Sequence, residues 1–449
     1  MPTVLGIALL TLAGAMVQAD ERPADRPPDY MPLGAYLSWE RPPELARMRG
    51  IDRWDDVAGR LDLLVQNSVD TIWVSNLLEE DLPRLIHECE KRGLRLIALT
   101  TNLEIRAPGR AEAGLDYYRP HIARLVKTAG DSKALAAWVI SDEPENHLHP
   151  FFEQVRQLFG QFDPNRPAIT VSTPRETPNL PLHSKVPVLC VDPYPFFAAG
   201  DPNGPHTEAQ SIQYYRQTIE AMMKAIGDRP TAGWVMGQAF AEIWGPQKYD
   251  QNGRLIGLPG AYLHWRCPTP AEVRWQIWEA FRAGGKGMFF FTATPMWDNP
   301  ANASLPSPDV AWKEVFAKEP TDVGFSALTT PDGSATPQLK EMGKVFGLLK
   351  PHGPLIVRWK ADSMEGIAVS QGISAGCFID PDQGGQYLVL VNDRLTHENT
   401  AKVKLPAGVR RVEEITQGKR ITPTADSEGR LFSLLLRPGE GAILHLITQ

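Results

Sequence analysis

The sequence predicts an α/β protein: a (β/α)8 TIM barrel followed by a small antiparallel β-sandwich domain. Eight short apolar runs lie between residues 33 and 294, and amphipathic helical stretches separate them. These runs are nearly continuous rather than alternating, which is typical of parallel strands buried on both faces. After about residue 351 the runs become short and are punctuated by Gly, Pro and Asn, which indicates antiparallel strands.

Each predicted strand is an apolar run with turn residues at its ends. The predicted strands cover residues 33–39, 70–76, 94–102, 135–141, 167–173, 187–195, 231–240 and 286–294. The helical stretches cover residues 54–65, 80–92, 117–129, 151–159, 209–226 and 271–283, with a shorter one at 179–184 and a last one at 337–349. Thr269 and Pro270 predict a helix start, and Gly93 predicts a helix end. A doubly wound sheet is the alternative, but eight similarly spaced parallel strands favour a closed barrel.

The amino-terminal residues predict export. Val4 to Val17 form an apolar run that is too short to span a bilayer comfortably and fits a signal-peptide core. Val17-Gln18-Ala19 supplies the small residues of a cleavage site, although the first three residues lack Lys and Arg; a buried amino-terminal helix is the alternative. We therefore predict a signal peptide over residues 1–19, a polar Pro-rich tether over 20–32, and a secreted, periplasmic or cell-surface protein without a membrane span after cleavage.

The remaining chain divides at the change of periodicity, into a barrel over residues 33–350 and a sandwich over 351–449. Hydrophobic residues make up 43% and charged residues 22% of the chain, which excludes a disordered, coiled-coil or polytopic membrane protein. The net charge is −7 and no basic block is present, so we expect no nucleic-acid partner. The four cysteines form neither a disulfide framework nor a zinc motif. Nothing in the sequence indicates an oligomeric state.

Acidic, amide and indole side chains gather where the predicted strands end. The carboxyl ends of the strands in such a barrel meet at one mouth, where its function lies. The candidates at these ends are Trp39, Asn102, Asp142, Glu143, Asp192, Tyr194, Gln238, Glu242, Trp244 and Trp297. Few Lys or Arg residues and no His cluster accompany them, so we expect neither a phosphate substrate nor a catalytic metal. No dinucleotide-binding motif follows an early strand, and we expect no cofactor.

Acids beside flat aromatic rings are the side chains that sugar chemistry uses. Aromatic faces pack on sugar rings, and two carboxyl groups supply proton transfer and nucleophilic or base assistance at a glycosidic bond. The tryptophans expected to line the cleft lie outside strand interiors, namely Trp39, Trp244, Trp265 and Trp297. The polar, Gly-rich and aromatic stretch 241–268 is predicted to be a long loop that forms one wall of the cleft.

Asp142-Glu143-Pro144 resembles the strand-4 Asn-Glu-Pro motif of clan A glycoside hydrolases. The resemblance implies that Glu143 is the general acid/base, with Asp142 in place of the usual Asn. The alternative is that these acids only cap the next helix. Asp192-Pro-Tyr194 is similar to a rim segment of the clan whose Tyr hydrogen-bonds the nucleophile, and the barrel and final strands resemble β-galactosidase-like and uncharacterised secreted members.

The sequence differs from the clan at the position of the second catalytic carboxylate. The clan carries its nucleophile, a Glu, at the end of strand 7, where this sequence has Gln238. An amide cannot serve, so Glu242 is the expected partner and Asp192 the next choice. Gln238, Tyr194, Asn102, Trp39 and Trp297 are then expected to line the site around the scissile sugar.

The sequence therefore predicts a secreted glycoside hydrolase that acts on a poly- or oligosaccharide. The missing strand-7 Glu keeps a second hypothesis open, a carbohydrate-binding barrel without catalysis. A third is an interaction protein in which the sandwich does the binding. The separation of the two carboxyl groups would distinguish retention from inversion, since retaining enzymes hold them ~5–5.5 Å apart and inverting enzymes ~6.5–9.5 Å apart.

Overall fold

The structure is a computed structural model. It describes residues 23–199, 201–202, 204–244, 247–249, 255–257, 262–295, 327–330, 332–426 and 429–448. The predicted signal peptide and Trp297 lie outside the described residues. Among the helices that are described, none combines the length and the apolar character needed to cross a bilayer.

The predicted barrel is confirmed. Eight parallel strands close on themselves in the order β1-β12-β7-β6-β5-β4-β3-β2. They are β1 (Leu33–Ser38), β2 (Thr71–Leu77), β3 (Arg95–Thr100), β4 (Leu135–Asp142), β5 (Ala168–Ser172), β6 (Val188–Val191), β7 (Ala232–Gln238) and β12 (Gly287–Phe291). Closure requires the glycine at position 34 of β1, because a Cβ there would lie 2.3 Å from the ring of Phe289 and 2.9 Å from the carbonyl oxygen of Thr71.

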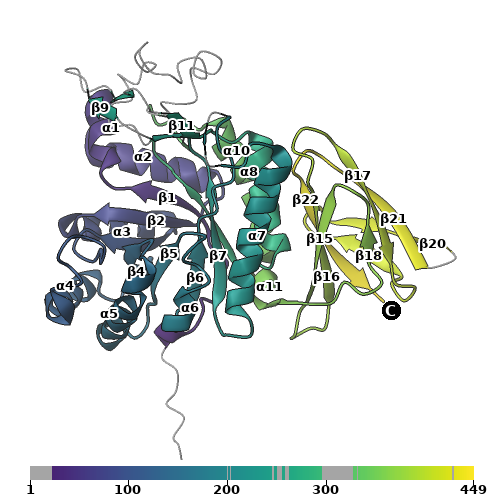
Figure 1. The fold of residues 1–449 in the computed structure, drawn as a ribbon, viewed down its shortest axis with the longest axis horizontal. Coiled ribbons are helices and arrows are strands. Elements are labelled where there is room, and N and C mark those ends of the chain that lie inside the picture. Colours follow the sequence, from purple (N-terminus) through teal and green to yellow (C-terminus); the bar gives the residue numbers. More distant parts are fainter. Residues whose placement is uncertain are drawn as a thin grey trace, which may run out of the picture.

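Helices surround this barrel (Figure 1). They are α1 (Arg41–Arg49), α2 (Arg53–Gln66), α3 (Leu82–Arg92), α4 (Gly114–Ala129), α5 (His149–Phe162), α6 (Leu180–His183), α7 (Glu208–Ile226), α8 (Pro270–Arg282), α10 (Pro337–Leu349) and α11 (Gly353–Arg358), with short 3-10 turns η1 (Pro23–Asp25), η2 (Glu79–Asp81), η3 (Asn146–Leu148) and η4 (Lys350–His352). Two predicted helix boundaries are confirmed. Thr269 and Glu272 form a reciprocal capping box at the start of α8, and Gly93 ends α3 in the left-handed conformation with φ 63°.

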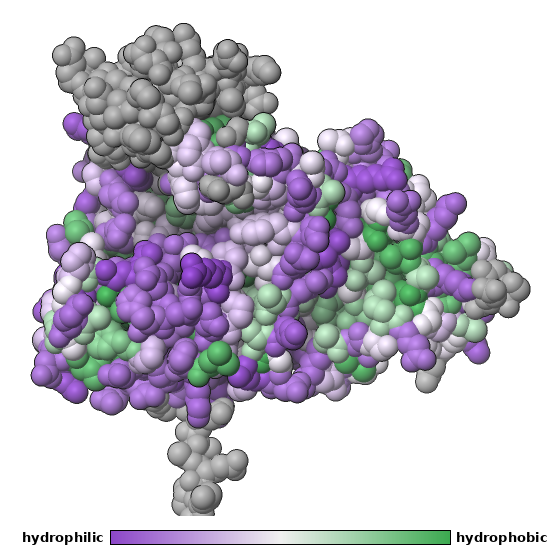
Figure 2. Space-filling model, in the orientation of Figure 1, coloured by the Kyte–Doolittle hydropathy of each residue, from purple (hydrophilic) through white to green (hydrophobic). Residues whose placement is uncertain are grey.

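The carboxyl-terminal part is the predicted sandwich of two antiparallel sheets, ordered β13-β15-β16-β22-β18-β19 and β14-β17-β21-β20. The strands are β13 (Lys360–Ala361), β14 (Ala368–Val369), β15 (Ile373–Ile379), β16 (Gln386–Asn392), β17 (Asn399–Leu405), β18 (Arg411–Glu414), β19 (Lys419–Ile421), β20 (Thr424–Asp426), β21 (Gly429–Leu436) and β22 (Gly441–Ile447). The first sheet packs against α8, where a Cβ at Gly441 would lie 2.5 Å from the Trp278 ring. Hydrophilic residues cover much of the visible barrel surface, whereas hydrophobic ones gather over the sandwich (Figure 2), where Leu435 is exposed.

Two regions differ from the sequence prediction. The stretch 241–268 is not simply a loop, because β8 (Glu242–Trp244) pairs with β11 (Tyr262–Trp265), and β9 (Gln247–Tyr249) pairs with β10 (Leu255–Gly257). The predicted tether does not hang free in its described part. The Ala24 amide donates to the carbonyl oxygen of Pro164, and Asp25 forms an ion pair of 2.6 Å with Arg156 of α5. Both segments are fixed by contacts with residues distant in sequence.

Candidate functional site

A cavity of about 250 Å³ lies at the carboxyl ends of the barrel strands. It is lined by Tyr36, Asp142, Glu143, Val171, Asp192, Tyr194, Met236, Phe240, Glu242, Trp244, Trp265 and Phe291. Four of these residues are acids and six carry aromatic rings. The cavity therefore combines the two kinds of side chain that the sequence placed at the mouth of the barrel.

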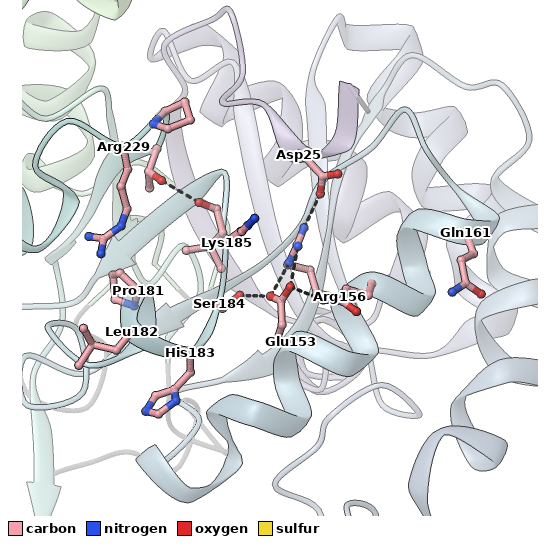
Figure 3. Close-up of a pocket in the computed structure, with 14 residues that line it drawn as sticks. Asp25, Glu153, Arg156, Gln161, Pro181, Leu182, His183, Ser184, Lys185 and Arg229 are labelled. Carbon is pink, nitrogen blue, oxygen red and sulfur yellow. Dashed lines mark hydrogen bonds and ion pairs between the residues drawn. The ribbon is translucent and has the colours of Figure 1, made fainter. Parts of the chain in front are cut away.

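A larger cavity of about 950 Å³ lies at the other end of the barrel, beside the residues that precede β6 and β7 (Figure 3). Four of its polar groups form a network: Arg156 contacts Asp25 at 2.6 Å and Glu153 at 2.8 Å, and Ser184 donates to Glu153. Active sites of such barrels lie at the carboxyl ends of the strands. We therefore assign the functional site to the smaller cavity and a structural role to this ion-pair network.

The backbone turns sharply at Glu143, directly after β4. Its φ is 50°, in the left-handed region that residues other than glycine seldom occupy. Its amide still donates to the carbonyl oxygen of Val171 at 3.1 Å, so the turn begins while the residue is held to β5. The helix-cap alternative is wrong, because α5 starts after Leu148 and no side chain caps it. A strained backbone at a cavity wall is a common property of functional residues.

Two residues that the sequence analysis missed support this turn. Glu104 accepts from the Ser141 hydroxyl at 2.6 Å and from the Asp142 amide at 2.9 Å. Arg106 lies 3.7 Å from Glu104, 3.7 Å from Asp142 and 3.8 Å from Glu143. Both residues follow β3, two and four positions beyond Asn102. In the sequence only their charge could have indicated that they belong to the site.

Burial and neighbouring acids raise the pKa of Asp192 and that of Asp142. Burial, the Glu143 charge and a hydrogen bond with Glu143 hold the pKa of Asp192 well above its usual range. Burial and then Glu143 raise the pKa of Asp142 to about 7, although Arg106 acts in the opposite direction. Burial also raises the pKa of Tyr194, and the adjacent carboxylates add to this effect. Burial and the neighbouring Glu143 therefore favour the neutral form of the Asp192 carboxyl group at the cavity wall.

Glu242 reaches the cavity from β8 rather than from the end of β7. Its Oε2 accepts from the Trp244 indole nitrogen at 3.0 Å. Burial raises its pKa, and the Glu143 charge adds to that shift while the Trp244 hydrogen bond opposes it. Trp244 stacks on His264 at 3.8 Å between ring centroids, with 18° between the planes, and is 42% exposed. Trp244 therefore presents an exposed indole surface beside the carboxyl group.

Three predicted site residues do not line this cavity. Gln238 is fully buried, and its amide bonds the backbone of Phe196 and Arg266 instead. Asn102 donates to Glu79 of η2 at 2.8 Å. Trp39 is 2% exposed and donates to Asp81 at 2.8 Å; it borders a separate hollow. The side chains of Asn102 and Trp39 are bound to a neighbouring loop turn rather than turned to the barrel mouth.

The other candidates come together as expected. The predicted residues that line the cavity are Asp142, Glu143, Asp192, Tyr194, Glu242, Trp244 and Trp265. Tyr36, Phe240 and Phe291 join them without having been predicted, since their apolar strand context gave no sign of exposure to a cavity. Within the described part of the chain, no group of three or more His, Cys, Asp and Glu side chains is arranged to hold a metal ion.

Comparison with known proteins gives a likeness of fold. No family model matches the chain, and no curated protein matches it. Among solved structures, apo β-glucuronidase from Ruminococcus gnavus has a TM-score of 0.47 and 10% identity over 72% of this chain and 51% of the other. Its complex with D-glucuronic acid has a TM-score of 0.46 and 11% identity over 71% and 49%. The chain spans about half the length of these structures.

Proposed function

We propose that this chain is a glycoside hydrolase with Glu143 as its general acid. The observation that carries the proposal is that Glu143 and Asp192 lie together, with Glu242, in the wall of an aromatic cavity at the carboxyl end of a closed barrel. Cleavage of a glycosidic bond needs a proton at the leaving oxygen and a carboxylate near the anomeric carbon. The cavity holds candidates for both roles.

In the proposed reaction Glu143 gives its proton to the leaving oxygen, and Asp192 lies beside it in the cavity wall. Glu242 assists at the anomeric carbon, either as nucleophile or by accepting a proton from the attacking water. In both cases water adds its OH to the sugar and its H to the leaving alcohol. Trp265 offers an indole N–H that is buried and has no acceptor among the described residues, so it can donate to a sugar oxygen.

The exposed face of Trp244 supports a sugar ring as the ligand. An aromatic face buries the apolar C–H surface of a pyranose and leaves the sugar hydroxyls free to bond with neighbouring polar groups. We also propose that the chain is exported, as the apolar run from Val4 to Val17 predicts, because polysaccharide substrates occur outside the cell. Amino-terminal sequencing of the mature protein tests it, with Asp20 as the expected first residue.

The experiment is a hydrolysis panel of aryl α- and β-glycosides, glucuronides included, and of oligosaccharides. For each accepted substrate, Glu143→Gln is expected to reduce turnover ~10²- to 10⁴-fold, the usual contribution of general acid catalysis. Glu145→Gln is the matched control, because that side chain is 73% exposed and bonds only to His147 among the described residues. Equal turnover by wild type and Glu143→Gln would refute the assignment, and the product anomer assigns retention or inversion.

A second candidate function is carbohydrate binding without catalysis. It is favoured by Gln238, because β7 ends in an amide that is committed to backbone hydrogen bonds rather than in a carboxylate. Binding of oligosaccharides by wild type, without hydrolysis of any member of the panel, would support it over the hydrolase.

A further inference from the structure

The cavity has an uneven charge balance. Four carboxyl groups line it, and none of its described lining residues is Lys, Arg or His. The Arg106 guanidinium stands outside the lining, 3.7–3.8 Å from Glu104, Asp142 and Glu143. One cation therefore serves three carboxylates at the rim. Asp192 and Glu242 receive no ion pair from the described residues.

Asp192 points most directly to a missing donor. The residue is 5% exposed, and its Oδ1 is buried without a hydrogen-bond donor among the described residues. Its side-chain neighbour Glu143 is itself an acid, so it brings no positive charge to this carboxyl group. Buried polar atoms in folded proteins nearly always have a partner, so an unpartnered one in a cavity wall calls for an explanation. A donor group of a bound ligand would provide it.

The aromatic residues around these acids also suit a positive charge. Tyr194 lies 4.9 Å from Phe240 and 5.5 Å from Trp265, and Phe240 lies 5.1 Å from Phe291, measured between ring centroids. The faces of such rings carry partial negative charge and attract cations. Asp192 is buried beside these rings, and burial strengthens the attraction between a carboxylate and a cation.

We propose that the cavity selects sugars that carry a free, protonated amine, and that the Asp192 carboxyl group receives the ammonium. This inference deepens the proposed function by naming its substrate class. A neutral hydroxyl could donate to Asp192 but, unlike an ammonium, would not favour the ionised form of this carboxyl group, which burial and Glu143 disfavour in the free protein. A uronic acid would bring a further carboxylate to the four carboxyl groups of the cavity. An N-acetyl group would remove the positive charge and enlarge the substituent in a cavity of about 250 Å³.

The test uses monosaccharides, which the intact protein binds but cannot hydrolyse. Dissociation constants are measured by titration calorimetry at pH 7 and low salt for D-glucosamine and D-galactosamine, each beside its parent sugar and its N-acetyl derivative, with D-glucuronate added. In at least one series the amine is expected to bind ten-fold more tightly or better than the parent sugar, about 1.4 kcal/mol. The preference should weaken as salt screens the charges.

Asp192→Asn keeps the size of the side chain and is expected to abolish the preference, whereas Glu145→Gln, which removes an exposed carboxylate nearby, should retain it. Thermal unfolding of each variant checks that it is folded. The proposal is overturned if the amines bind no more tightly than the parent sugars to wild type, or if a folded Asp192→Asn protein keeps the preference. The wild-type comparison alone remains decisive if that variant does not fold.

The outcomes separate this inference from the hydrolase proposal. Preferential binding of amino sugars without hydrolysis of any glycoside would support the charge selection and refute the hydrolase. Hydrolysis of neutral glycosides together with equal binding of amines and parent sugars would do the reverse.

Discussion

Replacing Gln238 by Glu tests whether the end of β7 is a catalytic position. The Gln238 side chain accepts from the Phe196 amide at 2.9 Å and donates to the Arg266 carbonyl oxygen at 2.8 Å. It also lies 3.3 Å from the carbonyl oxygens of Phe196 and Phe240. A carboxyl group in its place would keep the accepted bond but would face three carbonyl oxygens.

The cost of Gln238→Glu follows from these contacts. An ionised carboxylate has no donor for the carbonyl oxygens, and a protonated one has a single O–H for the Arg266 oxygen. Each buried polar group left without a partner costs about 1–3 kcal/mol. Because the two 3.3 Å contacts are long, we expect a total loss of about 2–4 kcal/mol in the free energy of unfolding at neutral pH.

The pH dependence of this loss has a definite sign. Burial among carbonyl oxygens would raise the pKa of the new Glu above its unfolded value of about 4.3. A group with a raised folded-state pKa loses its contribution to stability as the pH rises, so the defect should be larger at pH 8 than at pH 5.

Urea unfolding at both pH values measures the effect, with the exposed α7 residue Gln213→Glu as a control that should stay within about 0.5 kcal/mol of wild type. Unchanged stability of Gln238→Glu together with increased turnover would show that position 238 reaches the cavity, contrary to the reasoning.

Three further predictions concern charged and aromatic groups. Arg106→Met should raise the pKa of Asp142 above 7, because Arg106 opposes the rise in that pKa. The limb of the kcat/KM–pH profile that reports Asp142 should then move to higher pH. Trp244→Ala should raise KM roughly 5- to 30-fold, equivalent to 1–2 kcal/mol of lost ring contact, with little change in the unfolding midpoint. Burial lowers the pKa of Lys286 to about 7, so the contribution of Lys286 to stability should rise with pH between about 7 and 10, and Lys286→Met should remove that part of the slope in unfolding measured at pH 6.5 and 9.

The barrel could be predicted from the sequence because strand burial leaves a local pattern. A strand covered on both faces needs consecutive apolar residues, and the run 231–240 gave β7 as Ala232–Gln238. The stretch 241–268 left no such pattern. Its strands have three or four residues each, and β8 exists because it pairs with β11 nearly twenty residues later. Pairing over that separation is a property of the folded chain.

The site could be predicted only where the strand itself presents the side chain. Glu143 and Asp192 directly follow the final residues of β4 and β6, so locating the strands located the acids. Asn102 and Trp39 also follow strands, but η2 supplies Glu79 and Asp81 as their hydrogen-bond partners. Whether a rim residue faces the cavity is therefore decided by the loop beside it.

The amide at the end of β7 and the position of Glu242 on β8 have one explanation. Gln238 bonds the carbonyl oxygens of Phe240, two residues before β8, and of Arg266, one residue after β11. These two bonds anchor both ends of the antiparallel β8–β11 pair, hereafter the ribbon, which brings Glu242 and Trp265 to the cavity. An amide can do this because it donates twice, whereas a carboxylate cannot donate. In this chain the end of β7 therefore positions an acid that lies beyond it, and the function of the strand-end residue is to hold the ribbon in place.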